Sequence, residues 1–147
     1  MDKIQNQISN FFDQYEKRFN DALHGAAPDI KAVTESFADW FIESSPVGVI
    51  CGKNDEHFQT AIPQGYAHYR NIGITSMTIA SKEINLLDSY HAMAKINWIS
   101  NFVKKDNSKG TIEFQVIYFV RTKDEKYKIF GYITGDEQKA LQEKGLI

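Results

Sequence analysis

The sequence predicts an α+β fold in which three N-terminal helices pack on a strongly curved antiparallel β-sheet and a short helix closes the chain. Two observations predict it. Apolar residues recur every three or four positions up to Gly73 and every second position beyond it, where β-branched and aromatic residues become frequent. Short polar turns separate the later strands, which favours antiparallel pairing because parallel neighbours need long crossovers. The length of 147 residues, 42% of them hydrophobic, fits one domain spanning 1–147.

An amphipathic helix is predicted from Lys3 to about His24 because its apolar positions draw one stripe along a helix surface. The segment Gly25–Pro28 should end it, since glycine tolerates the left-handed cap and proline cannot continue the helix. The stripe consists of Ile4, Ile8, Phe11, Phe12, Tyr15, Phe19 and Leu23.

A second, shorter helix should begin at an Asp29 cap and reach about Ala38. Two short extended pieces follow, Trp40–Ile42 and Val49–Cys51, separated by a proline and glycine turn.

A third helix should start at Asn54 or Asp55 and run to about Ile72. Pro63 lies inside this segment, so we expect a kink or a restart of the helix there.

Four longer strands are predicted in the second half, followed by a helix that opens with a capping box at Thr134–Glu137 and stops at Gly145. The strands are Ser76–Leu87, Tyr90–Lys104, Gly110–Thr122 and Lys126–Thr134. In the second of them, Ala92, Ala94, Ile96 and Trp98 share one face.

Two apolar residues of the third of these strands, Ile117 and Phe119, lie on the face predicted to point away from the helices. An apolar outer face suggests a cover, so we expect a homodimer formed through the outer side of the sheet.

The charge balance excludes some partners. Seventeen basic and nineteen acidic residues give a formal charge of −2, which lacks the basic excess typical of nucleic-acid binding. We find no apolar run long enough to span a membrane and no secretion signal, so we expect a cytoplasmic protein. The single cysteine, Cys51, is interpreted as a small buried hydrophobe.

Several segments carry a family resemblance: Phe11–Tyr15, Ser36–Phe41, Ser45–Gly48, Tyr69–Arg70, Asp88–Ala92 with Trp98, Lys126–Phe130 and Gly131–Gln138. Together they resemble the nuclear-transport-factor-2-like superfamily, which includes SnoaL-like cyclases and ketosteroid isomerase. The resemblance covers nearly the whole chain, and the closing segment Gly131–Gln138 resembles an uncharacterised bacterial branch of the superfamily. It implies a cystatin-like cone, or half-barrel, with a deep pocket between sheet and helices, and commonly a dimer.

The resemblance also implies roles for single residues. Tyr15 falls at the helix-one tyrosine of ketosteroid isomerase, and Tyr118 falls near its second oxyanion donor, where a phenol could donate the same hydrogen bond. The base of that family precedes a Pro-Val-Gly turn, but Ser45 occupies this position here and a hydroxyl is not a useful base. Asp39 or Glu43 could supply a base from another direction, although edge carboxylates are more often simply solvated.

Our leading hypothesis is a binding protein that holds a small, largely apolar molecule, without a cofactor or metal. The expected lining is Tyr15, Trp40, Phe58, Trp98 and Tyr118, with Tyr15, Tyr118 and Asp39 as catalytic candidates if the protein is an enzyme. The enzymatic alternative is an isomerase, dehydratase or cyclase acting on a carbonyl compound. A third alternative is a dimeric interaction module without ligand, its pocket filled by its own aromatic side chains.

The four histidines give no metal-ligand spacing. They are His24, His57, His68 and His91. No His-x-x-x-His pattern accompanies them, so we predict that no metal is bound.

Overall fold

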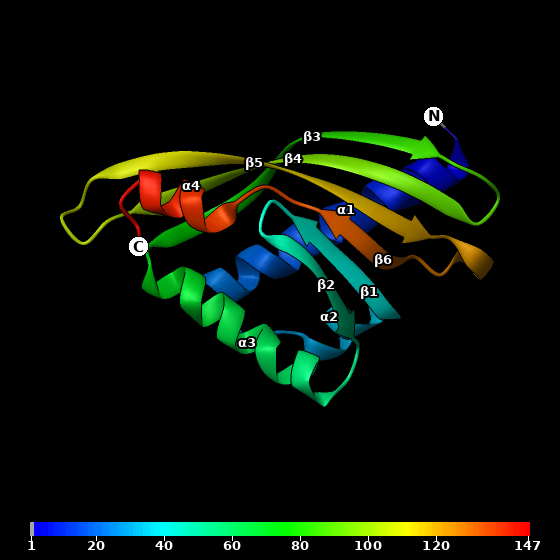
Figure 1. Ribbon diagram of the computed structural model, residues 1–147, viewed down its shortest axis with the longest axis horizontal. Helices are drawn as coiled ribbons and strands as arrows, with labels where there is room; N and C mark the ends of the chain where they lie inside the picture. The colour runs from blue at the N-terminus through cyan, green and yellow to red at the C-terminus, as the bar shows by residue number, and fades with distance from the viewer. Residues whose placement is uncertain (1) are drawn as a thin grey trace.

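The computed structural model describes residues 2–147, which leaves only Met1 of the predicted domain outside the described range. Four α-helices and six β-strands make up the fold (Figure 1). In chain order they are α1 (Lys3–Leu23), α2 (Ile30–Glu35), β1 (Phe37–Ser45), β2 (Gly48–Lys53), α3 (Glu56–Asn71), β3 (Ile74–Leu86), β4 (His91–Val103), β5 (Lys109–Arg121), β6 (Lys128–Ile133) and α4 (Glu137–Glu143). The α+β class and the order of helices and strands predicted from the sequence are confirmed.

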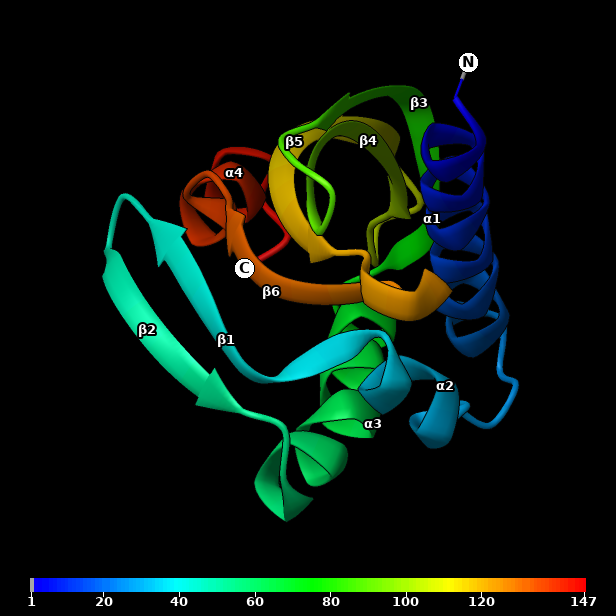
Figure 2. The same ribbon diagram turned by 90° about the vertical axis from the view of Figure 1, so that its right-hand side faces the viewer.

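The strands form one sheet in the order β2-β1-β6-β5-β4-β3. Strands β3 to β6 form the predicted antiparallel meander. The pair β1 and β6 is parallel, which the turn pattern did not predict. Parallel pairing is possible because α3 and four strands, β2 to β5, lie between these two segments in the chain and supply a long crossover. The sheet bends strongly, and the β1–β2 hairpin projects from the body (Figure 2).

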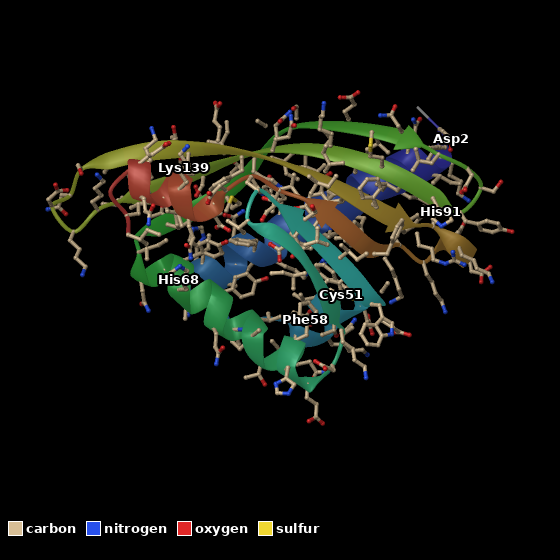
Figure 3. The ribbon with its side chains drawn as sticks, viewed as in Figure 1. Asp2, Cys51, Phe58, His68, His91 and Lys139 are labelled. Carbon is tan, nitrogen blue, oxygen red and sulfur yellow. The ribbon has the colours of Figure 1, made fainter. Side chains whose placement is uncertain are left out.

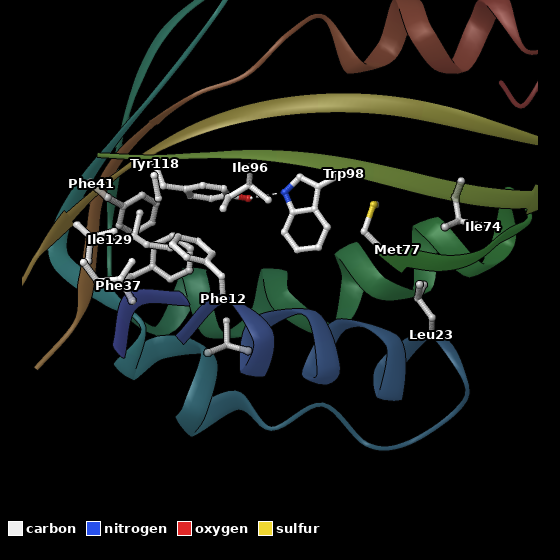
Figure 4. Close-up of a cluster of buried hydrophobic side chains, with 14 of the residues drawn as sticks. Phe12, Leu23, Phe37, Phe41, Ile74, Met77, Ile96, Trp98, Tyr118 and Ile129 are labelled. Atoms are coloured by element: carbon white, nitrogen blue, oxygen red, sulfur yellow. Dashed lines mark hydrogen bonds between the residues drawn. The ribbon is translucent and has the colours of Figure 1, made fainter. Parts of the chain in front are cut away.

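The core lies between α1 and the inner face of the sheet (Figure 4). On α1, Ile8 and Phe12 are completely buried. Facing them on β4, the alternating side chains from Ala92 to Trp98 are also buried, as the two-residue period predicted. Burial of this helix stripe and this strand face from water is the main contribution to the stability of the fold.

An aspartate side chain caps the first turn of each of the first three helices. The Asp2 side chain accepts a hydrogen bond from the Ile4 N–H and forms a capping box with Gln5. The Asp29 carboxylate caps α2, as the sequence predicted, and of the two residues predicted to begin the third helix, Asn54 and Asp55, it is Asp55 that caps α3.

The structure corrects several boundaries. The second helix ends at Glu35 rather than near Ala38, because the carbonyl of Ser36 accepts the Ile129 N–H of β6 and draws the following residues into the sheet. The third helix runs through Pro63 without a restart. The capping box predicted at Thr134–Glu137 is wrong, since Asp136 caps α4 through the Lys139 N–H.

Cys51 is exposed, so its interpretation as a buried residue is wrong. It lies on β2, an edge strand that pairs only with β1, and no other element covers this strand. Within residues 2–147, no helix combines the length and apolarity that crossing a bilayer would require.

Candidate functional site

A cavity of about 300 Å³ lies between α1, α3 and the inner face of the curved sheet. This volume is at the lower end of the range of small-molecule sites. Its lining is Tyr15, Phe19, Phe37, Glu43, Tyr69, Met77, Trp98, Phe114, Val116, Tyr118, Tyr132, Thr134 and Glu137. The lining is mostly aromatic and aliphatic, with polar groups concentrated on four tyrosines and two glutamates.

Three of the lining residues form an aromatic wall. The Trp98 Nε1–H donates a hydrogen bond of 3.2 Å to the Tyr118 hydroxyl (Figure 4). The Tyr15 ring lies 6.2 Å, between centroids, from both Trp98 and Tyr118. Strand alternation points Trp98 and Tyr118 inward, and the α1 stripe places Tyr15 opposite them. Three of the five residues predicted to line the pocket are therefore neighbours.

The hydroxyls of Tyr15 and Tyr118 are available as hydrogen-bond donors. Tyr118 accepts from Trp98, so its own proton remains free to donate. Within residues 2–147, the Tyr15 hydroxyl has no hydrogen-bond partner. Burial raises the pKa of both phenols above its ordinary value, with a further increase at Tyr15 from Tyr66 and at Tyr118 from Tyr15. Both groups therefore stay protonated at neutral pH.

Two pairs of a tyrosine and a glutamate complete the lining. The Tyr69 hydroxyl of α3 donates to Glu137 at the start of α4, which ties these two helices together. On the sheet, Glu43 of β1 pairs in register with Tyr132 of β6. Burial raises the pKa of Tyr132, and the charge of Glu43 and its hydrogen bond with the phenol raise it further.

Two residues predicted to line the pocket lie elsewhere. The Trp40 side chain is 59% exposed, and the Lys53 ammonium lies 5.4 Å from its ring centroid. Phe58 of α3 packs on Phe37 and Phe41, with ring centroids 5.3 and 5.1 Å apart, and belongs to the core rather than to the cavity lining.

The two acidic candidates, Asp39 and Glu43, differ in their position relative to the cavity. Asp39 is exposed on β1 and does not line the cavity, whereas Glu43, four residues further along the strand, does. Ser45, at the family position of the base, lies at the end of β1 and also outside the lining.

The sequence did not identify Tyr69, Tyr132 or Glu137 as lining residues. Alternation from the buried Ile129 would have placed Tyr132 on the outer face, and a β-bulge in β6 between Ile129 and Gly131 turns it inward, beside Tyr118. No sequence signal marks Glu137, because its position depends on how α4 docks beside α3.

The histidines are dispersed. The His24 Nε2 lies 2.8 Å from the Thr75 carbonyl oxygen, and His91 pairs with Asp88 in the β3–β4 turn. His68 and His91 lie at opposite ends of the molecule (Figure 3). In the part of the chain that the structure describes, no three His, Cys, Asp or Glu side chains are grouped closely enough to hold a metal ion.

Solved structures similar to this chain share its fold. An NTF-2-like protein of unknown function from Shewanella oneidensis has 18% sequence identity and a TM-score of 0.64, with 90% of this chain and 98% of that chain covered. A ketosteroid isomerase-like protein from Erwinia carotovora atroseptica has 16% identity and a TM-score of 0.63, covering 92% and 97%. An NTF2-like protein with a cystatin-like fold from Novosphingobium aromaticivorans has 10% identity and a TM-score of 0.67, covering 97% and 88%. At these identities the likeness concerns the fold alone.

No functionally curated protein matches the sequence. A family model does match, over residues 5–137, and its description is NTF2-like protein (DUF6841). This match spans nearly all of the helices and strands described above, and the similar solved structures carry the same architecture. The chain belongs to the NTF2-like protein family DUF6841.

Proposed function

We propose that the protein binds a small, largely apolar molecule in the cavity between α1 and the curved sheet. The observation that carries this proposal is a cavity of about 300 Å³ with an aromatic wall and free phenol donors. An apolar body would gain free energy by leaving water for this lining, and the donors of Tyr15 and Tyr118 would orient one oxygen atom of the ligand.

The cavity also bears on the alternative of an interaction module without ligand. In that alternative the aromatic side chains fill the interior themselves. Here the rings of Tyr15, Trp98 and Tyr118 contact one another and still leave open volume beside them. This volume supports the binding proposal.

Binding can be tested with N-phenylnaphthylamine, a neutral apolar dye whose fluorescence rises in apolar surroundings. We expect saturable binding to the native protein. Val116→Phe should abolish it, because Val116 lines the cavity and a larger side chain there occupies the ligand volume. Val47→Phe is the matched control, since Val47 is 80% exposed at the hairpin tip. Equal binding by the two variants, both folded by circular dichroism, would place the dye elsewhere.

A second measurement addresses the natural ligand. The purified protein is denatured, and the released small molecules are identified by mass spectrometry. An apolar compound recovered from the native protein and absent after purification of Val116→Phe would support the proposal and identify the ligand.

An enzymatic role on a carbonyl compound is a second candidate function, because Glu43 lines the same cavity as Tyr15 and Tyr118. Glu43 would remove a proton from the carbon beside the carbonyl, and the two phenols would donate hydrogen bonds to the resulting enolate oxygen.

This candidate predicts deuterium exchange into β-tetralone in D₂O, followed by NMR. The exchange should slow at least about 100-fold in Glu43→Gln, the usual contribution of a general base. Asp39→Asn is the control, because Asp39 is exposed and outside the lining. Identical exchange by wild type and Glu43→Gln would remove the enzymatic candidate while leaving the binding proposal intact.

We also propose that a second copy of the chain covers the outer face of the sheet. The registers place Ile42, Ile133, Ile117 and Phe119 on this face, on neighbouring strands. Ile42 is 49% exposed and Ile133 is 45% exposed in the single chain. Burying such a patch against its own copy is favourable.

Sedimentation velocity tests this arrangement. Wild type should sediment as a dimer, and Ile133→Lys should sediment as a monomer. Leu87→Lys, at a position 55% exposed in the β3–β4 turn, should leave the dimer unchanged. A monomeric wild type would contradict the proposal.

A further inference from the structure

The charged groups that line the cavity all have the same sign. Glu43 and Glu137 belong to the lining, and no lysine, arginine or histidine among residues 2–147 does. The walls between them are largely aromatic and aliphatic. Carboxylates beside apolar surface are disfavoured unless a positive charge or several hydrogen bonds accompany them.

Neither carboxylate is neutralised by the protein. Among residues 2–147, the ion pairs involve other acidic residues and leave out Glu43 and Glu137. The hydrogen bond that Glu137 accepts from Tyr69 comes from a neutral phenol and leaves its negative charge in place. The same holds for the contact between Glu43 and Tyr132.

The two carboxylates belong to one cavity. Glu43 lies beside Tyr132 in the register of β1 on β6, Glu137 accepts the hydroxyl of Tyr69, and all four residues line the cavity. In agreement with this placement, the negative charges of Glu43 and Glu137 both raise the pKa of Tyr132, after the larger effect of burial. Both charges therefore lie within electrostatic reach of the Tyr132 hydroxyl. A cation near this hydroxyl would interact favourably with both of them.

Three cations of the surrounding helices and of the β1–β2 hairpin do not pair with these carboxylates. Arg18 lies outside the lining and donates to the Ser36 hydroxyl, and its charge partly offsets the increase that burial causes in the pKa of Tyr15 on the cavity wall. Arg70 donates to the Ala22 carbonyl, and Lys53 lies over the exposed ring of Trp40. A cationic group on the ligand would therefore give the cavity carboxylates a positive partner that these three side chains do not provide.

We infer that the ligand carries an ammonium group, which the Glu43 and Glu137 carboxylates bind, attached to an apolar body that contacts the aromatic wall. The inference rests on the proposed binding function and specifies its ligand class, an amphipathic amine. A neutral oxygen of the same ligand can accept hydrogen bonds from the Tyr15 and Tyr118 hydroxyls, which form the second polar group of the cavity lining. The tyrosine rings beside the acidic pair add a favourable cation–π environment.

Three matched compounds test this inference in competition with bound N-phenylnaphthylamine at neutral pH. They share one para-methoxyphenyl body and end in an amine, an alcohol or a carboxylate: para-methoxyphenethylamine, para-methoxyphenethyl alcohol and para-methoxyphenylpropanoate. The amine should displace the dye at a concentration at least about tenfold lower than the alcohol, as expected for charge-assisted hydrogen bonds, and the carboxylate should be the weakest.

The variants Glu43→Gln and Glu137→Gln should each reduce the preference for the amine, and the double variant should abolish it. Glutamine keeps the shape of the side chain and an oxygen that accepts the Tyr69 or Tyr132 hydroxyl, so the fold should be retained. Glu83→Gln, at an exposed position of β3, is the control and should keep the full preference.

The outcomes separate this inference from the binding function. Equal displacement by amine and alcohol, or an unchanged preference in the double variant, would overturn the amine inference while the dye still binds. Absence of saturable dye binding to wild type would overturn the binding function and the amine inference together.

Discussion

The hydrogen bond between Trp98 and Tyr118 makes a quantitative prediction about stability. The two side chains are 4% and 6% exposed, so water has little access to the 3.2 Å hydrogen bond between them. Tyr118→Phe removes the acceptor and leaves the indole N–H buried without a partner, which costs about 1–3 kcal/mol. The ring itself remains, including its contact with Phe12 at 4.9 Å between centroids, so little packing energy is lost.

Urea denaturation followed by circular dichroism measures this loss directly. The free energy of unfolding should fall by about 1–3 kcal/mol in Tyr118→Phe, with an unchanged dependence on urea concentration. Tyr90→Phe is the matched control, because Tyr90 is 51% exposed. Its change should stay within about 0.5 kcal/mol. Equal stability of the two variants would show that the Trp98 N–H does not depend on the Tyr118 hydroxyl as its hydrogen-bond acceptor.

Three further predictions follow from the core, the backbone and the buried phenols. Phe12→Ala should lower the unfolding free energy by about 3–5 kcal/mol, because Phe12 is fully buried, and a loss below about 1 kcal/mol in urea denaturation would contradict its central position. Gly73→Ala should lower the melting temperature, since Gly73 has a φ of +101° and a Cβ there would lie 2.3 Å from the Val103 carbonyl oxygen. Gly65→Ala in α3, where a Cβ meets open space, should raise it slightly, and the reverse order would contradict the geometry. Because burial raises the pKa of the cavity tyrosines, the unfolded chain loses its phenol protons first, and stability should fall as pH rises above about 10, by about 1.4 kcal/mol per pH unit for each such tyrosine. Urea denaturation at several alkaline pH values measures this slope, and a constant stability would contradict the burial of these groups.

The sequence predicted the fold largely through local patterns. The α1 stripe and the alternation along β4 report directly which side chains face the core, and both are buried as expected. Asp29 and Asp55 could be assigned as caps because capping depends on residues within one turn.

Features that depend on distant segments were less predictable. Phe37 joins β1 because β6, far along the chain, pairs with it, and no local pattern distinguishes this residue from a helix terminus. Pro63 stays within a continuous helix, which local propensity disfavours and the surrounding structure permits.

The candidate site shows the same division. Tyr15 and Tyr118 were assigned to the pocket from the resemblance to ketosteroid isomerase and Trp98 as an aromatic wall, and all three line the cavity because they lie on the inward faces of regular elements. Trp40 was assigned to the cavity as an aromatic of β1, but its position in the strand alternates with Phe41 and points it outward. The role of Glu43 relative to Asp39, and the presence of Glu137, follow from the register of β1 on β6 and from the docking of α4, neither of which the sequence pattern contains.

Occupation of the cavity by a ligand is tested most directly by the fluorescence of Trp98. Trp40→Phe leaves Trp98 as the only tryptophan, located in the cavity wall. Titration of this variant with para-methoxyphenethylamine should change the Trp98 emission saturably, with one molecule bound per chain. An unchanged Trp98 emission, with a change only at Trp40 in the reciprocal Trp98→Phe variant, would show that the compound binds outside the cavity and would contradict the proposed site.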